Sequence, residues 1–275
     1  MKLHLFASAL ALPLAAAHPA AAQTDTLNEV VITGAPYAVS LDSATTHVDV
    51  LNTKALLAAP PAGLGDVLET LPGLRSSSYG PGASRPIIRG LSGPRVLLLQ
   101  NGTGLVDASA LSPDHAVAAD PGLASRVEVL RGPSALAYGG SAIGGVVNVI
   151  DDRIASTPAD RLEGRASGSW ADNGDGLAGG FALKTGRGPW VVTADGEHRT
   201  SGDYRAASAP VSDSLAAAEG LTPLPDKRVL NSDTELTAYG AGLSFVGARG
   251  FVGASVKRTE TTYGVPFSQD AANTP

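Results

Sequence analysis

The sequence predicts an α+β domain followed by the first antiparallel strands of a transmembrane β-barrel. Three observations lead to this prediction. They are an apolar leader over residues 1–22, mixed short helix and strand patterns over residues 36–155, and a regular alternation of side-chain type within residues 156–275. Of the 275 residues, 33 are glycine and only 5% are aromatic, which favours extended strands broken by turns over a compact enzyme core.

The composition excludes several classes of protein. The formal net charge of −6 argues against nucleic acid as a partner. The chain contains no cysteine, so disulfides, thiolate metal sites and cysteine nucleophiles are excluded. The sequence also lacks a G-x-S-x-G elbow, an H-E-x-x-H pair and a G-K-[ST] phosphate loop. We therefore expect a protein that is not an enzyme.

The leader has the order of residues found in secretory signals. Lys2 precedes an apolar stretch over residues 3–17, and three alanines at 20–22 precede Gln23. Pro13 interrupts the stretch, which is shorter than the ~20 residues that a transmembrane helix needs. We expect export, with cleavage after Ala22.

The segment after the leader, residues 23–35, contains a short β-prone run. Val30, Val31 and Ile32 lie together and Gly34 ends the run. Such a segment is able to add as a strand to the sheet edge of another protein. The alternative is an ordinary first strand of the following domain.

Residues 36–155 predict one compact α+β unit. A helical pattern within residues 56–74 places Leu64, Val67, Leu68 and Leu71 on one face, before Pro72 and Gly73. Strands are predicted at residues 86–90, 96–100, 126–131 and 146–150. Asn101 and Gly102 predict a tight turn after the second of them.

Five strands of about ten residues follow, each with one polar face and one small or apolar face. They are predicted at residues 161–170, 177–187, 190–199, 235–246 and 251–261. Tight turns alternate with a long polar stretch over residues 200–234, as in bacterial outer-membrane barrels. A soluble β-sandwich would alternate similarly, but the thin apolar faces and the aromatic residues near strand ends favour a barrel. A barrel that holds a domain needs about 22 strands, so we expect the chain to be the N-terminal part of a longer receptor.

Several motifs resemble those of TonB-dependent outer-membrane receptors. They are LPGL at residues 71–74, RPIIRG at 85–90 and RVEVLRGPSALAYGGSAIGGVVNVI at 126–150. The resemblance implies a plug domain over residues 36–155 inside a barrel of about 22 strands. It also implies that the protein lies in the bacterial outer membrane, in contact with outer-membrane lipid. It also implies active transport without a prosthetic group. The implied partners are TonB and its inner-membrane energising complex. The implied TonB box comprises Thr26, Leu27, Asn28, Glu29, Val30, Val31, Ile32 and Thr33.

Within this family, residues 80–115 resemble the zinc-uptake receptors. The resemblance implies that Asp114 and His115 are zinc ligands on the plug and that zinc is the transported ligand, which suits carboxylate and imidazole chemistry. Otherwise these two residues form a loop pair with local hydrogen bonds. Residues 263–266 resemble the start of a loop that is often rich in histidine, but no histidine follows here. A ferric-siderophore or haem receptor is the alternative within the family. A secreted β-rich adhesion or binding module is the alternative from another class.

Three charges in the α+β unit are candidates for ion pairs inside a polar lumen. Arg89, Glu128 and Arg131 lie in or next to predicted strands. We expect them to pair with one another or with the barrel wall. The alternative is that they belong to a solvated strand edge.

Overall fold

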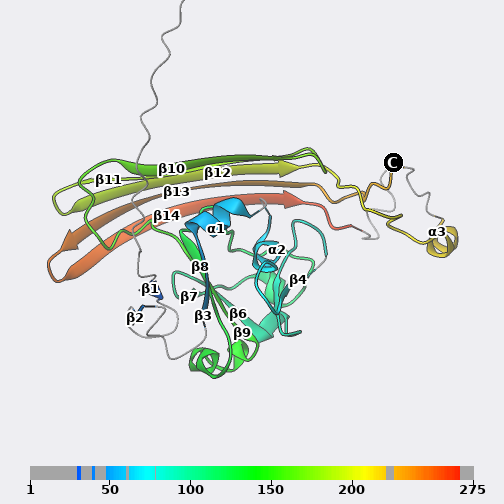
Figure 1. Ribbon diagram of the computed structural model, residues 1–275, viewed down its shortest axis with the longest axis horizontal. Coiled ribbons are helices and arrows are strands. Elements are labelled where there is room, and N and C mark those ends of the chain that lie inside the picture. The colour runs from blue at the N-terminus through cyan, green and yellow to red at the C-terminus, as the bar shows by residue number, and fades with distance from the viewer. Residues whose placement is uncertain are drawn as a thin grey trace, which may run out of the picture.

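The computed structural model describes residues 30–31, 39–40, 48–59, 62–77, 79–220 and 226–266. The predicted signal sequence lies outside these residues, as does the segment 23–35 except for Val30 and Val31. A curved sheet of five long strands lies over an α/β domain, with α1 and α2 on the side of the domain that faces the sheet (Figure 1). Within the described residues, no helix has the length and apolar character needed to cross a membrane.

The α/β domain is built on a five-stranded sheet with the order β3-β8-β9-β6-β7. The pair β6–β9 is parallel, and the other pairs are antiparallel. The strands of this sheet are β3 (Val48–Asn52), β6 (Val96–Gln100), β7 (Thr103–Gly104), β8 (Arg126–Leu130) and β9 (Gly145–Ile150). The smaller strands β4 (Leu74–Ser76) and β5 (Pro86–Ile88) form a separate pair.

The helices differ from the sequence prediction in one respect. The predicted helical face occurs in α2 (Leu64–Leu68), but a second helix, α1 (Thr53–Ala58), precedes it. Asn52 caps α1 by accepting a hydrogen bond from the amide of Ala55, which provides a start signal that the apolar pattern does not contain. Predicted strand 86–90 ends early, at Ile88, because Arg89 and Gly90 have positive φ angles of 50° and 80°.

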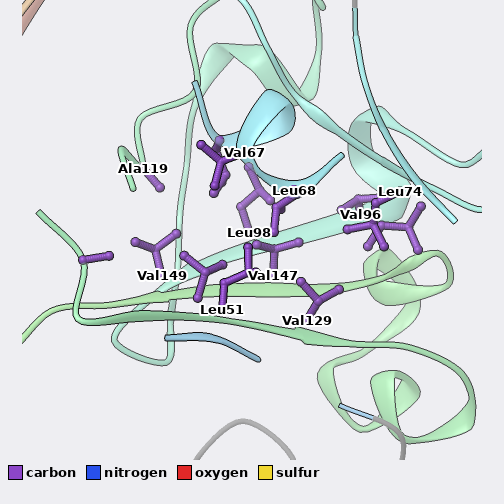
Figure 2. Close-up of a cluster of buried hydrophobic side chains, with 14 residues drawn as sticks. Leu51, Val67, Leu68, Leu74, Val96, Leu98, Ala119, Val129, Val147 and Val149 are labelled. Carbon is purple, nitrogen blue, oxygen red and sulfur yellow. The ribbon is translucent and has the colours of Figure 1, made fainter. Parts of the chain in front are cut away.

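Both faces of the α/β sheet carry apolar side chains. The larger cluster joins α2 to the sheet and includes Leu68, Val96, Val129 and Val147, all of which are fully or almost fully buried (Figure 2). A second cluster on other side chains of the same strands includes Leu130 and Val146. Sheets covered on both faces favour apolar residues at successive positions, which is why GVVNVI identifies β9 in the sequence. RVEVL of β8 instead alternates, and the charged Glu128 is buried as well.

The five long strands form one antiparallel sheet in chain order. They are β10 (Glu163–Ala171), β11 (Gly176–Arg187), β12 (Trp190–Ser201), β13 (Thr234–Gly247) and β14 (Gly250–Tyr263). Two-residue turns at 188–189 and 248–249 join strands at one end. The turn 172–175 and the long connection 202–233, which contains α3 (Asp213–Glu219), lie at the other end.

Side chains on these strands alternate between two environments. On β12, Val191, Thr193 and Asp195 are buried against the α/β domain, whereas Trp190 and Val192 are exposed on the opposite face. The exposed face is apolar along most of its length, and near the two-residue turns Trp190 packs edge-to-face on Phe245 with a centroid distance of 5.2 Å. Apolar residues facing outward with aromatics near the strand ends are typical of barrel strands in a membrane.

Candidate functional site: the contacts between the α/β domain and the strands

Arg153 holds the end of the α/β domain to the inner face of the sheet. It follows β9, and its Nη2 lies 2.6 Å from Oδ1 of Asp195 on β12. Its Nη1 pairs with Asp151, and the side chains of Arg153 and Asp195 are only 3% and 8% exposed. The Arg153 carbonyl accepts a hydrogen bond of 2.7 Å from Thr193 Oγ1. A Cβ at Gly242 would lie 2.0 Å from that carbonyl oxygen, so β13 needs glycine here.

Arg199, also on β12, makes the second buried charged contact. Its Nη2 lies 2.8 Å from Oδ2 of Asp120, in the loop before β8, and its Nη1 lies 3.3 Å from Oε1 of Glu197. The same Nη1 is within 3.4 Å of the carbonyl oxygen of Ala62, between α1 and α2. Arg199 therefore bridges two separate segments of the α/β domain.

The loop that contains Asp120 is held by a second arginine and a close approach. Arg165 on β10 donates hydrogen bonds to the carbonyls of Leu123 and Ala124, at 3.2 and 3.0 Å. Gly122 lies so near the inner face of the wall, the sheet β10–β14, that a Cβ at this position would be 2.0 Å from a carboxylate oxygen of Glu197 on β12. The strands thus hold residues 120–124 through charged and backbone polar groups, together with a small apolar cluster in which Leu123 packs on Leu236 and Ala238 of β13.

A cavity of about 220 Å³ lies between the α/β domain and the strands, below the loops at the long-connection end. Ser84, Ala119 and Asp120 line it from the domain, and Asn173 and Arg199 line it from the strands. Sites for drug-sized molecules usually have volumes of about 300–1,000 Å³. The cavity is therefore smaller than a usual site for a drug-sized molecule.

Asp114 and His115 lie on a loop after the 3₁₀ helix at Ala108–Ala110. Asp114 is partly exposed, and a hydrogen bond from Ser112 Oγ lowers the pKa of its carboxyl group below the usual value. His115 is exposed. No group of three or more His, Cys, Asp or Glu residues with metal-binding geometry occurs in the described part of the chain. The described residues therefore bring the predicted pair to one surface without a third ligand.

The base of this loop is held by a buried charge pair that the sequence reading missed. Arg85 Nη1 lies 3.2 Å from Oδ1 of Asp107, and Arg85 Nη2 donates to the carbonyls of Gly93 and Val96 at 3.1 Å. Burial lowers the pKa of Arg85, and the nearby Asp107 opposes that shift. The same carboxylate accepts the amide hydrogens of Ala110 and Ala118, which closes residues 107–118 into a loop.

The three charges predicted to form ion pairs have different environments. Glu128 is fully buried and pairs with Arg126 at 2.7 Å, within β8. Arg131 pairs with Asp49 of β3 and also donates a 2.6 Å hydrogen bond to the carbonyl of Pro72. Both therefore pair inside the α/β domain with residues that the prediction did not name. Arg89 is exposed in the turn after β5, and its amide donates to the carbonyl of Gly73 at 3.0 Å.

The predicted coupling segment is described at two of its residues. β1 (Val30–Val31) pairs antiparallel with β2 (Val39–Ser40), with Val30 opposite Ser40 and Val31 opposite Val39. Thr26, Leu27, Asn28, Glu29, Ile32 and Thr33 lie outside the described residues.

The residues that join the domain to the strands were not recognised in the sequence. Arg153, Arg199 and Arg165 contact groups that are roughly 40–80 positions away in the chain. One signal was available. Asp195, Glu197 and Arg199 place charges at every second position of a predicted strand, on the face opposite Trp190 and Val192. Charges on the inner face of a barrel strand are candidates for contact with a domain in the lumen.

Comparison with known proteins identifies the α/β domain. Residues 40–146 match the model of the TonB-dependent receptor plug domain. The chain is 30% identical over 192 residues to the vitamin B12 transporter BtuB of Photobacterium profundum, covering 69% of this chain and 31% of that protein. It is 33% identical over 132 residues to the ferric enterobactin receptor PirA of Pseudomonas aeruginosa, covering 42% of this chain and 17% of that protein.

Solved structures show the same fold at lower identity. The copper transporter OprC superposes with a TM-score of 0.62 at 16% identity, over 81% of this chain and 32% of that chain. The pyoverdine outer membrane receptor FpvA from Pseudomonas aeruginosa superposes with a TM-score of 0.59 at 16% identity, over 86% of this chain and 31% of that chain.

These comparisons test the predicted fold class and the expectation that the protein is not an enzyme. They confirm the prediction of a mixed α/β plug followed by antiparallel barrel strands, and the family agrees with the expectation that the chain is not an enzyme. The chain spans about 31% and 17% of the two curated relatives named above. Residues 40–146 are therefore a TonB-dependent receptor plug domain, and together with the antiparallel strands above it they have the fold of the TonB-dependent receptors of the bacterial outer membrane.

Proposed function

We propose that this chain acts in energy-dependent uptake of a scarce nutrient across the outer membrane. The observation that carries the proposal is the plug, which is held under the inner face of the strands by Arg153, Arg165 and Arg199 through polar contacts. Permanent interfaces are usually more apolar than this. An interface built from ion pairs and hydrogen bonds suits a plug that must separate from its wall during transport.

The energy is proposed to come from TonB in the periplasm. The outer membrane has no ATP and no ion gradient of its own, so uptake against a gradient needs coupling to the inner membrane. Substrate binding shifts the plug equilibrium and makes residues 26–33 available. TonB then pairs with that segment through backbone hydrogen bonds and pulls on the plug.

Zinc is the proposed substrate, with Asp114 and His115 as its ligands on the plug. Both are accessible on one loop, and the hydrogen bond from Ser112 favours the ionised carboxylate of Asp114. Imidazole nitrogen and carboxylate oxygen are ordinary zinc ligands. Two ligands are half of a tetrahedral site, so the proposal requires further ligands from the receptor or water.

A ferric siderophore is the second candidate substrate. It is favoured by the 33% identity with PirA, which is named as a ferric enterobactin receptor. A chelate would occupy much more space than zinc and would engage loops as well as the plug. Haem has no comparable support among the relatives named above.

Proline substitution tests the coupling role of residues 26–33. Val31→Pro removes one ladder donor from this segment, so we expect loss of uptake while substrate binding stays normal. Val31→Thr keeps the amide and is the matched control, which should transport like the wild type. Both variants should be made in the intact gene in the native cell. Normal uptake by Val31→Pro would refute the coupling role.

Metal limitation tests the substrate. We expect receptor expression to rise under zinc starvation, and radiolabelled zinc uptake to fall at least tenfold in Asp114→Asn with His115→Gln. Expression and uptake of a ferric siderophore should be measured in parallel. Induction by iron starvation alone, with zinc uptake unchanged in the double variant, would overturn the assignment of zinc in favour of the iron chelate.

A further inference from the structure

Tyr263, at the end of β14, reaches the plug loop that carries Asp114 and His115. Its phenol oxygen accepts a hydrogen bond of 3.0 Å from the amide of Ala116, a residue 147 positions earlier in the chain. Ala116 follows His115 directly. A bond to the backbone at this position constrains the loop while leaving both candidate ligand side chains uncovered.

The same tyrosine packs against a second part of the plug. A Cβ at Gly82 would lie 2.2 Å from Cβ of Tyr263 and 2.6 Å from its Cγ, so no side chain fits at position 82 while the ring stays in place. Close by, a Cβ at Gly80 would lie 2.8 Å from Cδ of Pro266. Two glycines of the GPG segment therefore permit the end of β14 to approach the plug backbone.

The residues after Tyr263 are tied to the long connection between β12 and β13. The amide of Gly264 donates to the carbonyl of Asp233 at 3.0 Å. Asn231 Nδ2 donates to the carbonyl of Val265 at 2.8 Å. The YGVP segment at 263–266 thus joins the plug to the base of the long connection at one point.

The base of the plug loop, residues 107–118, is fixed from within the plug. Asp107 accepts the amides of Ala110 and Ala118 and pairs with the buried Arg85. Residues 107–118 are therefore closed at their base by Asp107, and Tyr263 holds them from the strand side two positions before that closure. This arrangement restricts the loop in two directions.

We propose that Tyr263 is a positioning residue that fixes loop 107–118, and with it Asp114 and His115, relative to the strands and the long connection. The inference rests on the proposed function, because it assigns a role in substrate binding at the same site. The hydroxyl and the ring act separately. The hydroxyl fixes the backbone of the loop at Ala116, and the ring fixes the distance between β14 and Gly82. A change at the YGVP segment is thereby passed to the candidate ligands.

Amide hydrogen exchange tests the positioning directly, in the receptor purified from the native outer membrane. Tyr263→Phe removes the acceptor but keeps the ring, so exchange at Ala116 should rise about fivefold, the effect of losing roughly 1 kcal/mol of protection. Tyr79→Phe is the matched control, because Tyr79 lies next to Gly80 on the plug but is 48% exposed. Unchanged exchange at Ala116 in Tyr263→Phe would overturn the proposal.

Uptake kinetics provide the second readout, in cells that carry each variant at wild-type level. With radiolabelled zinc as the probe, we expect Tyr263→Phe to raise the half-saturating concentration three- to tenfold while the maximal rate stays within twofold. Gly82→Ala, which displaces the ring, should raise it further. An unchanged half-saturating concentration alongside faster Ala116 exchange would overturn the role in binding. If the wild type takes up no zinc, the proposed substrate fails, and Ala116 exchange still decides whether Tyr263 positions the loop.

Discussion

The interior of the plug is mainly apolar, whereas its contact with the strands buries more charged side chains. Inside the plug, Leu68, Val129 and Val147 are completely buried among other aliphatic residues. At the contact with the strands, the buried groups are Arg153 with Asp195 and Arg199 with Asp120. The first region is an ordinary apolar core, whereas the second combines ion pairs and hydrogen bonds with two small apolar clusters of three and four residues.

The difference determines what each region can do. Exposing apolar surface costs about 25 cal/mol per Å² and nothing in water replaces it. A hydrogen bond that is exchanged for water on both sides loses only about 1 kcal/mol. The plug is therefore able to keep its own fold while its contact with the wall is exchanged for water. The comparison predicts that substitutions in the two regions have separate consequences.

The largest effect is expected in the plug core. Leu68→Ala should lower the free energy of unfolding by about 3 kcal/mol, because it leaves a cavity in a completely buried position. Leu57→Ala, at a residue 48% exposed on α1, is the control and should cost no more than about 0.5 kcal/mol. Denaturant unfolding measures both. Equal costs would contradict the division between core and surface.

A smaller effect is expected at the contact. Asp195→Ala leaves the buried Arg153 with Asp151 as its carboxylate partner. It should weaken the attachment of the linker, residues 151–162 between β9 and β10, to the strands by about 2 kcal/mol. Asp195→Asn keeps a hydrogen-bond acceptor and should cost less. Amide exchange over residues 151–155 is the measurement. If Asp195→Ala destabilised the plug core instead, the two regions would not be independent.

The next effect concerns pH. Burial raises the pKa of Asp66, in α2, above its ordinary value of 3.8, against a weaker opposing effect of the nearby hydroxyls of Ser76 and Ser84. A carboxyl whose folded pKa is raised contributes stability that is complete below pH 3.8 and is lost as pH rises through the folded value.

Asp66→Asn should therefore flatten the pH dependence of stability. We expect the variant to gain on the wild type as pH increases from 3.8 toward neutrality, by less than the change at Asp195. Thermal unfolding across this range is the measurement, and Asp160→Asn, at an exposed residue before β10, is the control. A gain that grew toward acid pH would contradict the assignment.

The smallest effect is expected for a charge pair on the outside of β14. Arg258 and Glu260 pair in the structure, but their side chains are 63% and 58% exposed. Exposed pairs contribute little to stability. Arg258→Ala should give no measurable change in the free energy of unfolding, whereas Arg199→Ala on the inner face should loosen residues 120–124 in amide exchange. If Arg258→Ala and Arg199→Ala changed amide exchange around their partners equally, burial of a charge pair would not determine its contribution.

The sequence allows much of the fold to be predicted, because local patterns carry it. The alternation that starts at residue 161 places the five long strands, and the apolar runs at β6, β8 and β9 identify the plug sheet. Helix α1 was missed because its six residues begin at a side-chain cap, without a long apolar face.

The candidate site is less predictable, because its contacts join distant parts of the chain. Arg153 reaches Asp195 across 42 positions, and Tyr263 reaches Ala116 across 147. No local pattern contains such a pairing. Glu128 shows a different limit: its charge within an apolar strand was noticed, but its complete burial and its pairing with Arg126 on the same strand were not.

A reversible cross-link tests the central claim, that residues 120–124 must separate from the wall during transport. Residues 1–275 contain no cysteine, so Gly122→Cys with Glu197→Cys introduces the one possible disulfide within them, and the shorter side chain at 197 frees the space now filled by the carboxylate. Ala155→Cys with Ser244→Cys is the control pair at the linker, where the amide of Ala155 lies 2.9 Å from Ser244 Oγ.

The decisive measurement is substrate uptake by the oxidised and the reduced 122–197 variant. We predict that oxidation abolishes uptake and that a reducing agent restores it, while substrate binding is retained in both states and the 155–244 control transports normally. Full uptake with the 122–197 disulfide formed would contradict the account, because the plug loop would then never leave the strands.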